Sequence, residues 1–172
     1  ALTLFLSVIV IQLFLRPDPY LTANKTAEGS LAKKRETTRS ALAHIREYPL
    51  ALFAIASVAI GHLAMVSIMV MTPVHMAHFD ATLRVIGLVI SVHVLGMYAF
   101  SPIVGAISDK LGRVRTIQIG VVILIASALI SGMAPHHDSF TLGFGLFLLG
   151  LGWSFTLIAG STLLSETVSF EM

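Results

Sequence analysis

The sequence predicts an all-α, polytopic membrane protein, and three observations support this fold class. Hydrophobic residues make up 56% of the 172 residues, and charged residues only 12%, whereas about a quarter of a typical soluble chain is charged. The mean hydropathy is +0.90. Five apolar runs contain no Asp, Glu, Lys or Arg: 1–15, 48–72, 85–105, 116–133 and 140–165. We therefore expect five membrane-spanning helices.

The lengths of the runs support this interpretation. A spanning helix needs about 20 mostly apolar residues, and a charge at its centre costs roughly 2.5 to 3.5 kcal/mol. The last four runs meet this length within the error of their boundaries. The run 1–15 is shorter and ends at Arg16. It lacks the basic region and cleavage site of a signal peptide, so we expect a spanning helix that is only partly included.

The positions of Lys and Arg predict the orientation. Seven of the eleven lie in 16–47 and three in 106–115, while Arg84 is alone in the connections on the other side. The positive-inside rule therefore places 16–47 and 106–115 in the cytoplasm and the helices in the cell membrane. The basic excess follows membrane topology, so we expect no nucleic-acid partner. Cysteine is absent, which excludes disulfides and thiolate metal clusters.

A motif of chemically distinctive residues follows the third run. Residues 105–115 read Gly-Ala-Ile-Ser-Asp-Lys-Leu-Gly-Arg-Val-Arg. This segment resembles the loop motif of the major facilitator superfamily, roughly G-x-L-a-D-r-x-G-R followed by a basic residue. Ile107 replaces the usual Leu, and Val114 stands where a basic residue is common. The matching anchors are Gly105, Asp109, Gly112 and Arg113.

The resemblance implies a register within a twelve-helix fold. The long basic segment 16–47 is similar to the loop between the two halves of such a protein, which makes 1–15 part of helix six. Residues 48–172 then hold helices seven to ten, the first four of the second half. The segments 71–76 and 87–91 also resemble bacterial members of the family.

The resemblance further implies the function. We expect a secondary transporter of a small solute that works by alternating access, with proton-coupled efflux as one form. The implied partners are the solute, protons, the lipid bilayer and the other helices of the same protein, and no cofactor is expected. The residues implied to hold the cytoplasmic gate closed in one conformation are Gly105, Asp109, Lys110, Gly112 and Arg113.

The motif residues also have a physical role of their own. Gly105 at a helix end would let a neighbouring helix approach, and Gly112 can adopt a left-handed conformation in a tight turn. Asp109 can accept hydrogen bonds from a helix N-terminus or pair with Lys110 or Arg113. An ordinary charged turn is the alternative interpretation.

Two histidines lie within predicted spans. His62 and His93 are both expected about 3 Å outside the midplane, at one depth. Imidazole titrates near neutral pH, so either could carry protons or bind a solute. Alternatively, each packs as a neutral side chain against Ser57, Ser67 or a backbone carbonyl.

The remaining candidates are apolar or small. Met65 and Met69 share the face of His62, either as a flexible wall for a lipophilic solute or as core. Trp153, next to Ser154, lies at mid-depth either as a stacking platform or as a packing residue. A stripe of small residues is expected to allow close helix contact: Gly152, Thr156 and Gly160.

Four histidines are expected in loops on the outer side. They offer a weak metal-binding pattern, and solvated loop residues are the alternative. Two other functions also stay open at this point: a membrane-embedded enzyme that binds a metal or haem, and a non-transporting receptor. The enzyme lacks acidic ligands or a nucleophile within the spans. The four residues are His75, His78, His136 and His137.

Overall fold

Long helices make up the structure, a computed structural model that describes residues 47–135 and 138–169. These residues contain no strand. The predicted span 1–15 and almost all of the predicted loop 16–47 lie outside the described residues, as do His136 and His137. The helices are α4 (Pro49–His78), α5 (Leu83–Tyr98), α6 (Ser101–Leu111), α7 (Arg113–Met133) and α8 (Ser139–Ser169).

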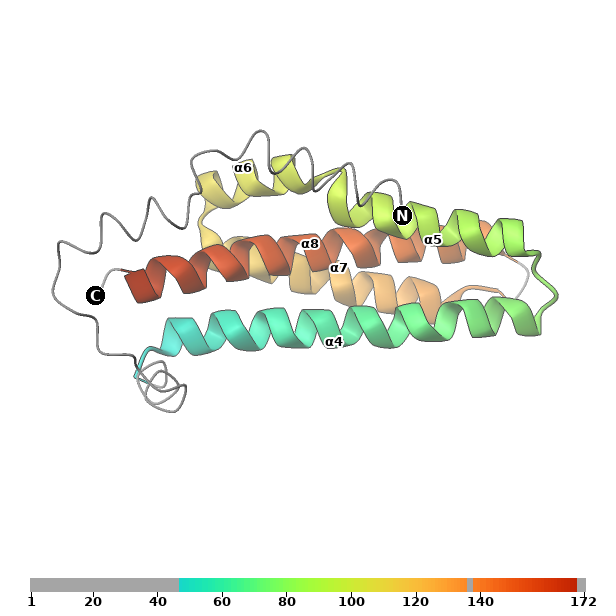
Figure 1. Ribbon diagram of the computed structural model, residues 1–172, viewed down its shortest axis with the longest axis horizontal. Coiled ribbons are helices and arrows are strands. Elements are labelled where there is room, and N and C mark those ends of the chain that lie inside the picture. The colour runs from blue at the N-terminus through green and yellow to red at the C-terminus, as the bar shows by residue number, and fades with distance from the viewer. Residues whose placement is uncertain (1–46, 136–137, 170–172) are drawn as a thin grey trace, which may run out of the picture. The chain divides into compact units, whose positions relative to one another are not determined.

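Four stretches are long and apolar enough to cross a membrane, and they confirm the predicted polytopic helical class. Successive stretches run in opposite directions (Figure 1). The junction of α6 with α7 therefore lies at the same end as the C-terminal part of α8. We call it the Arg113 end, and the opposite one the Asp138 end. The stretches are Pro49–His78, Leu83–Leu111, Arg113–Met133 and Ser139–Thr167.

Prolines shape the helices without setting all of their ends. Pro49 begins α4, where a missing N–H leaves no intrahelical bond unmade. The sequence predicted that this span would end at residue 72, but α4 continues through Pro73 to His78. Membrane helices tolerate such an internal proline. The span 83–111 is interrupted at Ala99 and Phe100, just before Pro102, and so forms α5 and α6.

Helix α8 is the central element of the described residues. In its most apolar stretch 67% of the residues are buried, against 17 to 28% in the other three. Three apolar clusters join it to its neighbours: Leu142 and Leu146 pack with Val89, and Leu149 and Trp153 pack with residues of α4 and α7. Ala159 and Leu163 extend the core toward the Arg113 end.

Small residues bring the helix backbones close together. A Cβ at Gly152 would lie 3.0 Å from the Gly120 carbonyl oxygen of α7, and one at Gly160 only 2.5 Å from a methyl group of Val58 on α4. A Cβ at Gly61 of α4 would lie 2.6 Å from Thr156 Oγ1. The predicted small-residue stripe therefore does mediate close helix contact, with α7 on one side and α4 on the other.

Candidate functional site

An ionic cluster centred on Arg113 joins three helices at the Arg113 end. Its Nη1 donates to Asp109 Oδ1 at 2.5 Å and to Ser108 Oγ at 3.0 Å, both on α6. Its Nη2 and Nε donate to Glu166 Oε1 on α8 at 2.8 and 3.2 Å. The planar guanidinium can bind these three side chains at once because its donors diverge in a fixed fork.

The turn at Gly112 brings these groups together. Gly112 ends α6 and precedes α7 with φ 88° and ψ 154°, a conformation that residues with a Cβ rarely adopt. The positive φ expected for Gly112 is therefore confirmed, and its role in a gate stays a prediction. Asp109 pairs with Arg113, one of the two predicted partners, while Lys110 is exposed and forms no salt bridge with the described residues.

Among the described residues, Gly105 does not make a close helix contact. No described atom lies within 4 Å of the position of a Cβ at this residue. Gly105 is half-buried within α6, and its surroundings among residues 47–135 and 138–169 would accept a methyl group. The close approaches occur instead at other glycines, on α4, α5, α7 and α8.

Sequence reasoning missed Glu166, which provides the contact between the turn and α8. Its side chain is 44% exposed, that of Asp109 68% and that of Arg113 21%. One side of the cluster is therefore exposed to solvent, and water can replace its hydrogen bonds when the helices move. A signal was present: Glu166 is the first charge after the last apolar run, and the predicted topology places it on the side of the motif.

A neutral hydrogen bond joins α4 to α8 at mid-depth. Trp153 Nε1 donates to His62 Nδ1 at 3.1 Å. Trp153 lies at the middle of the stretch 139–167, and His62 lies within two residues of the middle of α4. The ring of Tyr98, beside the midpoint of 83–111, meets Trp153 edge-on at a centroid distance of 6.3 Å. Two sequence-predicted candidates therefore contact each other directly.

Most of the other predicted candidates pack in the interior. Trp153 is only 8% exposed and lies in a cluster with Met65, while Met69 packs against its edge. Trp153 therefore offers little free surface for stacking a solute, and the packing interpretation fits both methionines. Ser154 is buried, with its Oγ 3.5 Å from Ser101 Oγ. The exposed candidate in this group is His62.

His93 forms a different interhelical bond. Its Nδ1 lies 2.9 Å from the Leu146 carbonyl oxygen and so donates to it, as the packing alternative allowed. Its Nε2 is buried without a partner among the described residues. Leu146 and Trp153 are seven residues apart on α8, which is about 10 Å along the axis. The prediction that His62 and His93 share one depth is therefore wrong.

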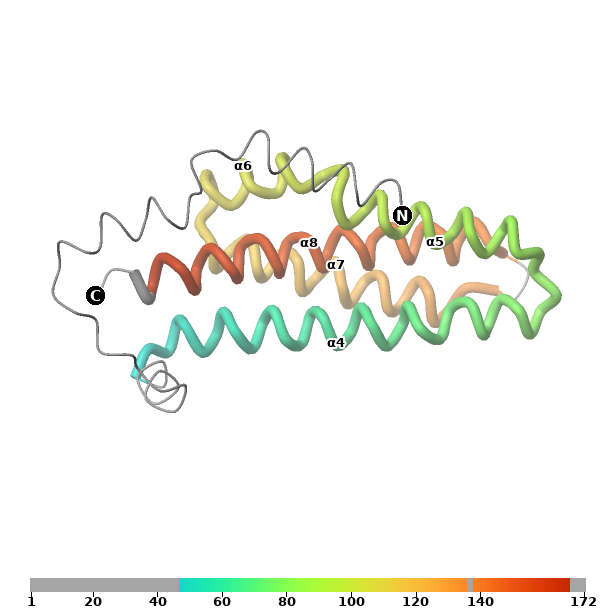
Figure 2. Tube along the Cα trace, in the orientation of Figure 1, coloured from blue at the N-terminus to red at the C-terminus, as the bar shows by residue number. Residues whose placement is uncertain are grey.

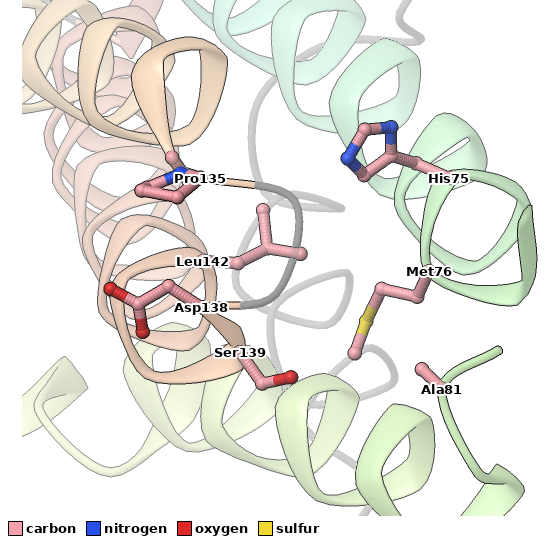
Figure 3. Close-up of a pocket in the computed structure, with 8 residues that line it drawn as sticks. His75, Met76, Ala81, Pro135, Asp138, Ser139 and Leu142 are labelled. Atoms are coloured by element: carbon pink, nitrogen blue, oxygen red, sulfur yellow. The ribbon is translucent and has the colours of Figure 1, made fainter. Parts of the chain in front are cut away.

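A small pocket lies at the Asp138 end, between the ends of α4 and α8 (Figure 3). His75 and Asp138 line opposite parts of it. The space open to a water-sized sphere is about 20 Å³, enough for about one water. His75 and His78 lie in the last turns of α4 rather than in a loop. Within the described ranges, no three His, Asp or Glu residues gather as a metal site would require.

Asp138 begins α8 by accepting hydrogen bonds at its N-terminus. The Thr141 hydroxyl and the backbone N–H groups of Thr141 and Phe140 all donate to its carboxylate. These bonds, that of the Thr141 hydroxyl above all, hold the pKa of Asp138 below its ordinary value. The contact is an N-cap and needs no ligand to explain it.

Comparison with known proteins gives a consistent result. The family model described as Major Facilitator Superfamily matches residues 1–172. Two relatives are the Bacillus subtilis proteins named Uncharacterized MFS-type transporter YddS and YdeG, which are 33% and 36% identical over 92% and 94% of this chain. The alignments cover 37% and 38% of those proteins, so the chain spans little more than a third of their length.

A plant protein gives a shorter match. The Probable plastidic glucose transporter 1 of Arabidopsis thaliana is 41% identical over 66 residues, which are 38% of this chain and 12% of that protein. No solved structure matches the chain significantly.

Proposed function

This chain belongs to the Major Facilitator Superfamily, and from that premise we propose that it forms part of a transporter that moves a small solute across the cell membrane by alternating access. Members of this family are transporters and not enzymes, so the metal- or haem-enzyme interpretation is set aside. The chain spans little more than a third of the length of the two Bacillus subtilis relatives, and we propose that further helices of the same protein complete the solute pathway. The proposal includes proton-coupled efflux of the small solute as one form of this transport.

The observation that carries the proposal is the Arg113 cluster. We infer that it forms one side of the cytoplasmic gate, because ten of the eleven Lys and Arg residues lie in the segments assigned to that side. Alternating access needs contacts that hold one conformation and yield in another. A half-exposed charged network suits this role, since water can take over its hydrogen bonds.

Two properties make the cluster more than an ordinary charged turn. Arg113, the first residue of α7, binds groups on α6 and on α8, so its contacts depend on how these helices are placed. The turn itself has a conformation that favours glycine. An isolated surface ion pair would need neither feature.

Reconstitution of the intact protein tests the proposed function. Lipid vesicles with the protein, and matched vesicles without it, are loaded with labelled sugars, amino acids or lipophilic cations, and flux is followed with and without an imposed proton gradient. The proposal expects protein-dependent flux of at least one solute class. Saturable binding without flux would instead support the receptor interpretation.

Cysteine labelling tests the orientation. The sequence contains no cysteine, so single cysteines introduced at Lys110 and Asp80 report on opposite ends of the spans. A membrane-impermeant reagent added outside intact cells should label residue 80 and leave residue 110 unlabelled until the membrane is opened. Labelling of both, or of residue 110 alone, would overturn the cytoplasmic assignment.

A further inference from the structure

The contact between α4 and α8 at mid-depth has an unusual construction. The two helices run side by side (Figure 2), and Gly61 lets Thr156 approach α4 closely. The next residue, His62, is thereby placed within hydrogen-bonding distance of Trp153 Nε1. A polar bond therefore sits beside the close approach, within a largely apolar interface.

The donor and acceptor roles in this bond are fixed by chemistry. The indole nitrogen of Trp153 can only donate, so Nδ1 of His62 must accept through its lone pair. In neutral His62 the ring proton is then on Nε2. A protonated imidazole carries N–H groups on both nitrogens and has no acceptor left. The bond seen in the structure therefore requires a neutral His62.

We propose that Nδ1 of His62 is a proton-binding site, and that protonation there breaks the bond to Trp153 and so weakens the contact between α4 and α8 at mid-depth. The described residues leave one side of His62 exposed. In the proposed step a proton from water on that side forms an N–H bond with the Nδ1 lone pair, and the ring becomes a cation. No other group is consumed. The proposal rests on the proposed transport function and names the residue through which protons act on it.

The described helices around His62 bring no Asp, Glu, Lys or Arg to its depth. Asp, Glu, Lys and Arg are absent from residues 49–78 of α4 and from the facing segments 116–133 of α7 and 139–165 of α8. Segment 85–108 of α5 and α6 contributes two titratable groups, His93 and Tyr98. His93 is bonded to Leu146 farther along α8, and the ring of Tyr98 meets Trp153.

Linkage gives the direction of the effect. Proton binding must favour any conformation in which His62 and Trp153 are apart, because the bonded conformation cannot hold the proton at Nδ1. In the same way, a conformation that keeps the bond disfavours proton uptake. Proton binding and the separation of α4 from α8 are therefore coupled, with no acidic residue in the span.

The indole N–H signal of Trp153 in nuclear magnetic resonance tests the proposal. The intact, isotope-labelled transporter is used, with any tryptophan outside this chain replaced by phenylalanine, since this chain contains only one. Between about pH 8 and pH 5, where histidine titrates, the signal should shift in a single step as the bond is lost. A signal that does not change with pH overturns the proposal.

Two variants identify the responsible residue. His62→Gln keeps a carbonyl acceptor for Trp153 but cannot be protonated, so the step should disappear. His75→Gln, at the far end of α4, should retain the step. A step that persists in His62→Gln overturns the proposal. The wild-type titration needs no variant, so a folding defect in His62→Gln would not prevent a decision.

Transport measurements separate this proposal from the proposed function. If solute flux responds to a proton gradient, His62→Gln should lose that response, and His75→Gln should retain it. If the wild-type signal shifts and flux ignores the gradient, the proton site stands and proton coupling of transport fails. If flux responds to the gradient and the signal does not shift, the site assignment fails and the transport function stands.

Discussion

The Arg113 end and the middle of the membrane span solve the same problem with different chemistry. Both places tie α8 to another helix through side chains. At the Arg113 end the tie is ionic, with Arg113 between Asp109 and Glu166. At mid-depth it is a bond between two neutral rings, His62 and Trp153. The difference follows the solvent, because an uncompensated charge is expensive in the bilayer and well tolerated at its edge.

The comparison shows how each contact can be released. Water competes for the ionic cluster, so its strength depends on exposure and salt. The neutral bond is partly shielded from water and is lost when one partner changes its protonation state. We therefore expect one region to respond to movement and the other to protons, and variants should affect the two independently.

The largest effect is expected from Arg113→Ala. Each hydrogen bond to a charged group contributes about 1.5 to 3 kcal/mol, and about 1.4 kcal/mol corresponds to a tenfold change. Solute flux in vesicles should therefore fall roughly tenfold to a hundredfold. The Trp153 indole signal should stay at its wild-type position. A shift of that signal would show that the two regions are not independent.

Arg115→Ala is the matched control. Arg115 lies two residues farther along α7 and is exposed. Its replacement by alanine removes the same charge from the same end of the helix. Its flux should stay close to that of wild type. If Arg115→Ala impaired flux as much as Arg113→Ala, the loss would come from net charge at this end and not from the cluster.

Gly112→Ala should mainly affect stability. A residue with a Cβ is strained at φ 88° and ψ 154°, at a cost of about 1 to 3 kcal/mol. The thermal unfolding midpoint of the purified protein should fall, and the bonds of Arg113 should weaken with the turn. Gly87→Ala is the control, since no described atom within 4 Å opposes a methyl group there. Equal destabilisation by both would remove the special role of the turn.

Asp109→Asn should have a smaller effect. Asp109 is 68% exposed, and Arg113 keeps its bonds to Glu166 when this charge is lost. Exposed ion pairs contribute about 0 to 1 kcal/mol, so flux should fall by no more than about fivefold. The difference in flux between wild type and variant should be present at low salt and should disappear at high salt, where the ion pair is screened. An unchanged flux at low salt would remove Asp109 from the gate.

The smallest effect is expected at the opposite end, from Asp138→Ala. The pKa of Asp138 is lowered in the folded protein by the Thr141 hydroxyl and by backbone N–H groups. Its carboxylate therefore stabilises α8 at neutral pH, and this stabilisation is lost as the pH falls through the folded-state pKa. The unfolding midpoints of wild type and variant should differ slightly at pH 7 and converge below about pH 4. If the difference between the two unfolding midpoints became larger in acid, this role of the carboxylate would be contradicted.

The sequence predicted the helices well because hydropathy and charge report directly on membrane insertion. It predicted the end of α4 less well: the run was expected to end at residue 72, but the helix continues through Pro73, which membrane helices tolerate because other groups bond the freed carbonyl. The unusual turn at Gly112 was predicted correctly, since a glycine between a helix end and a basic residue marks such a turn.

Contacts between helices were harder to predict. The pairing of His62 with Trp153 depends on which faces meet, and that is set by the close approach of Gly61 to Thr156. Hydropathy contains no such information. Glu166 was missed because it lies just beyond the end of an apolar run, and such runs are defined by the residues inside them. His62 and His93 were assigned one depth because small errors in span boundaries become shifts of several ångströms.

A charge reversal across the Arg113 end provides the decisive test of the gate. Flux is measured in vesicles for Arg113→Glu, for Glu166→Arg and for both together, at equal amounts of folded protein. If the contact itself holds the gate, each single change should lower flux at least about tenfold, and the double change should recover at least about tenfold of the loss. Fully active single variants, or a double variant as inactive as the singles, would contradict the gate assignment.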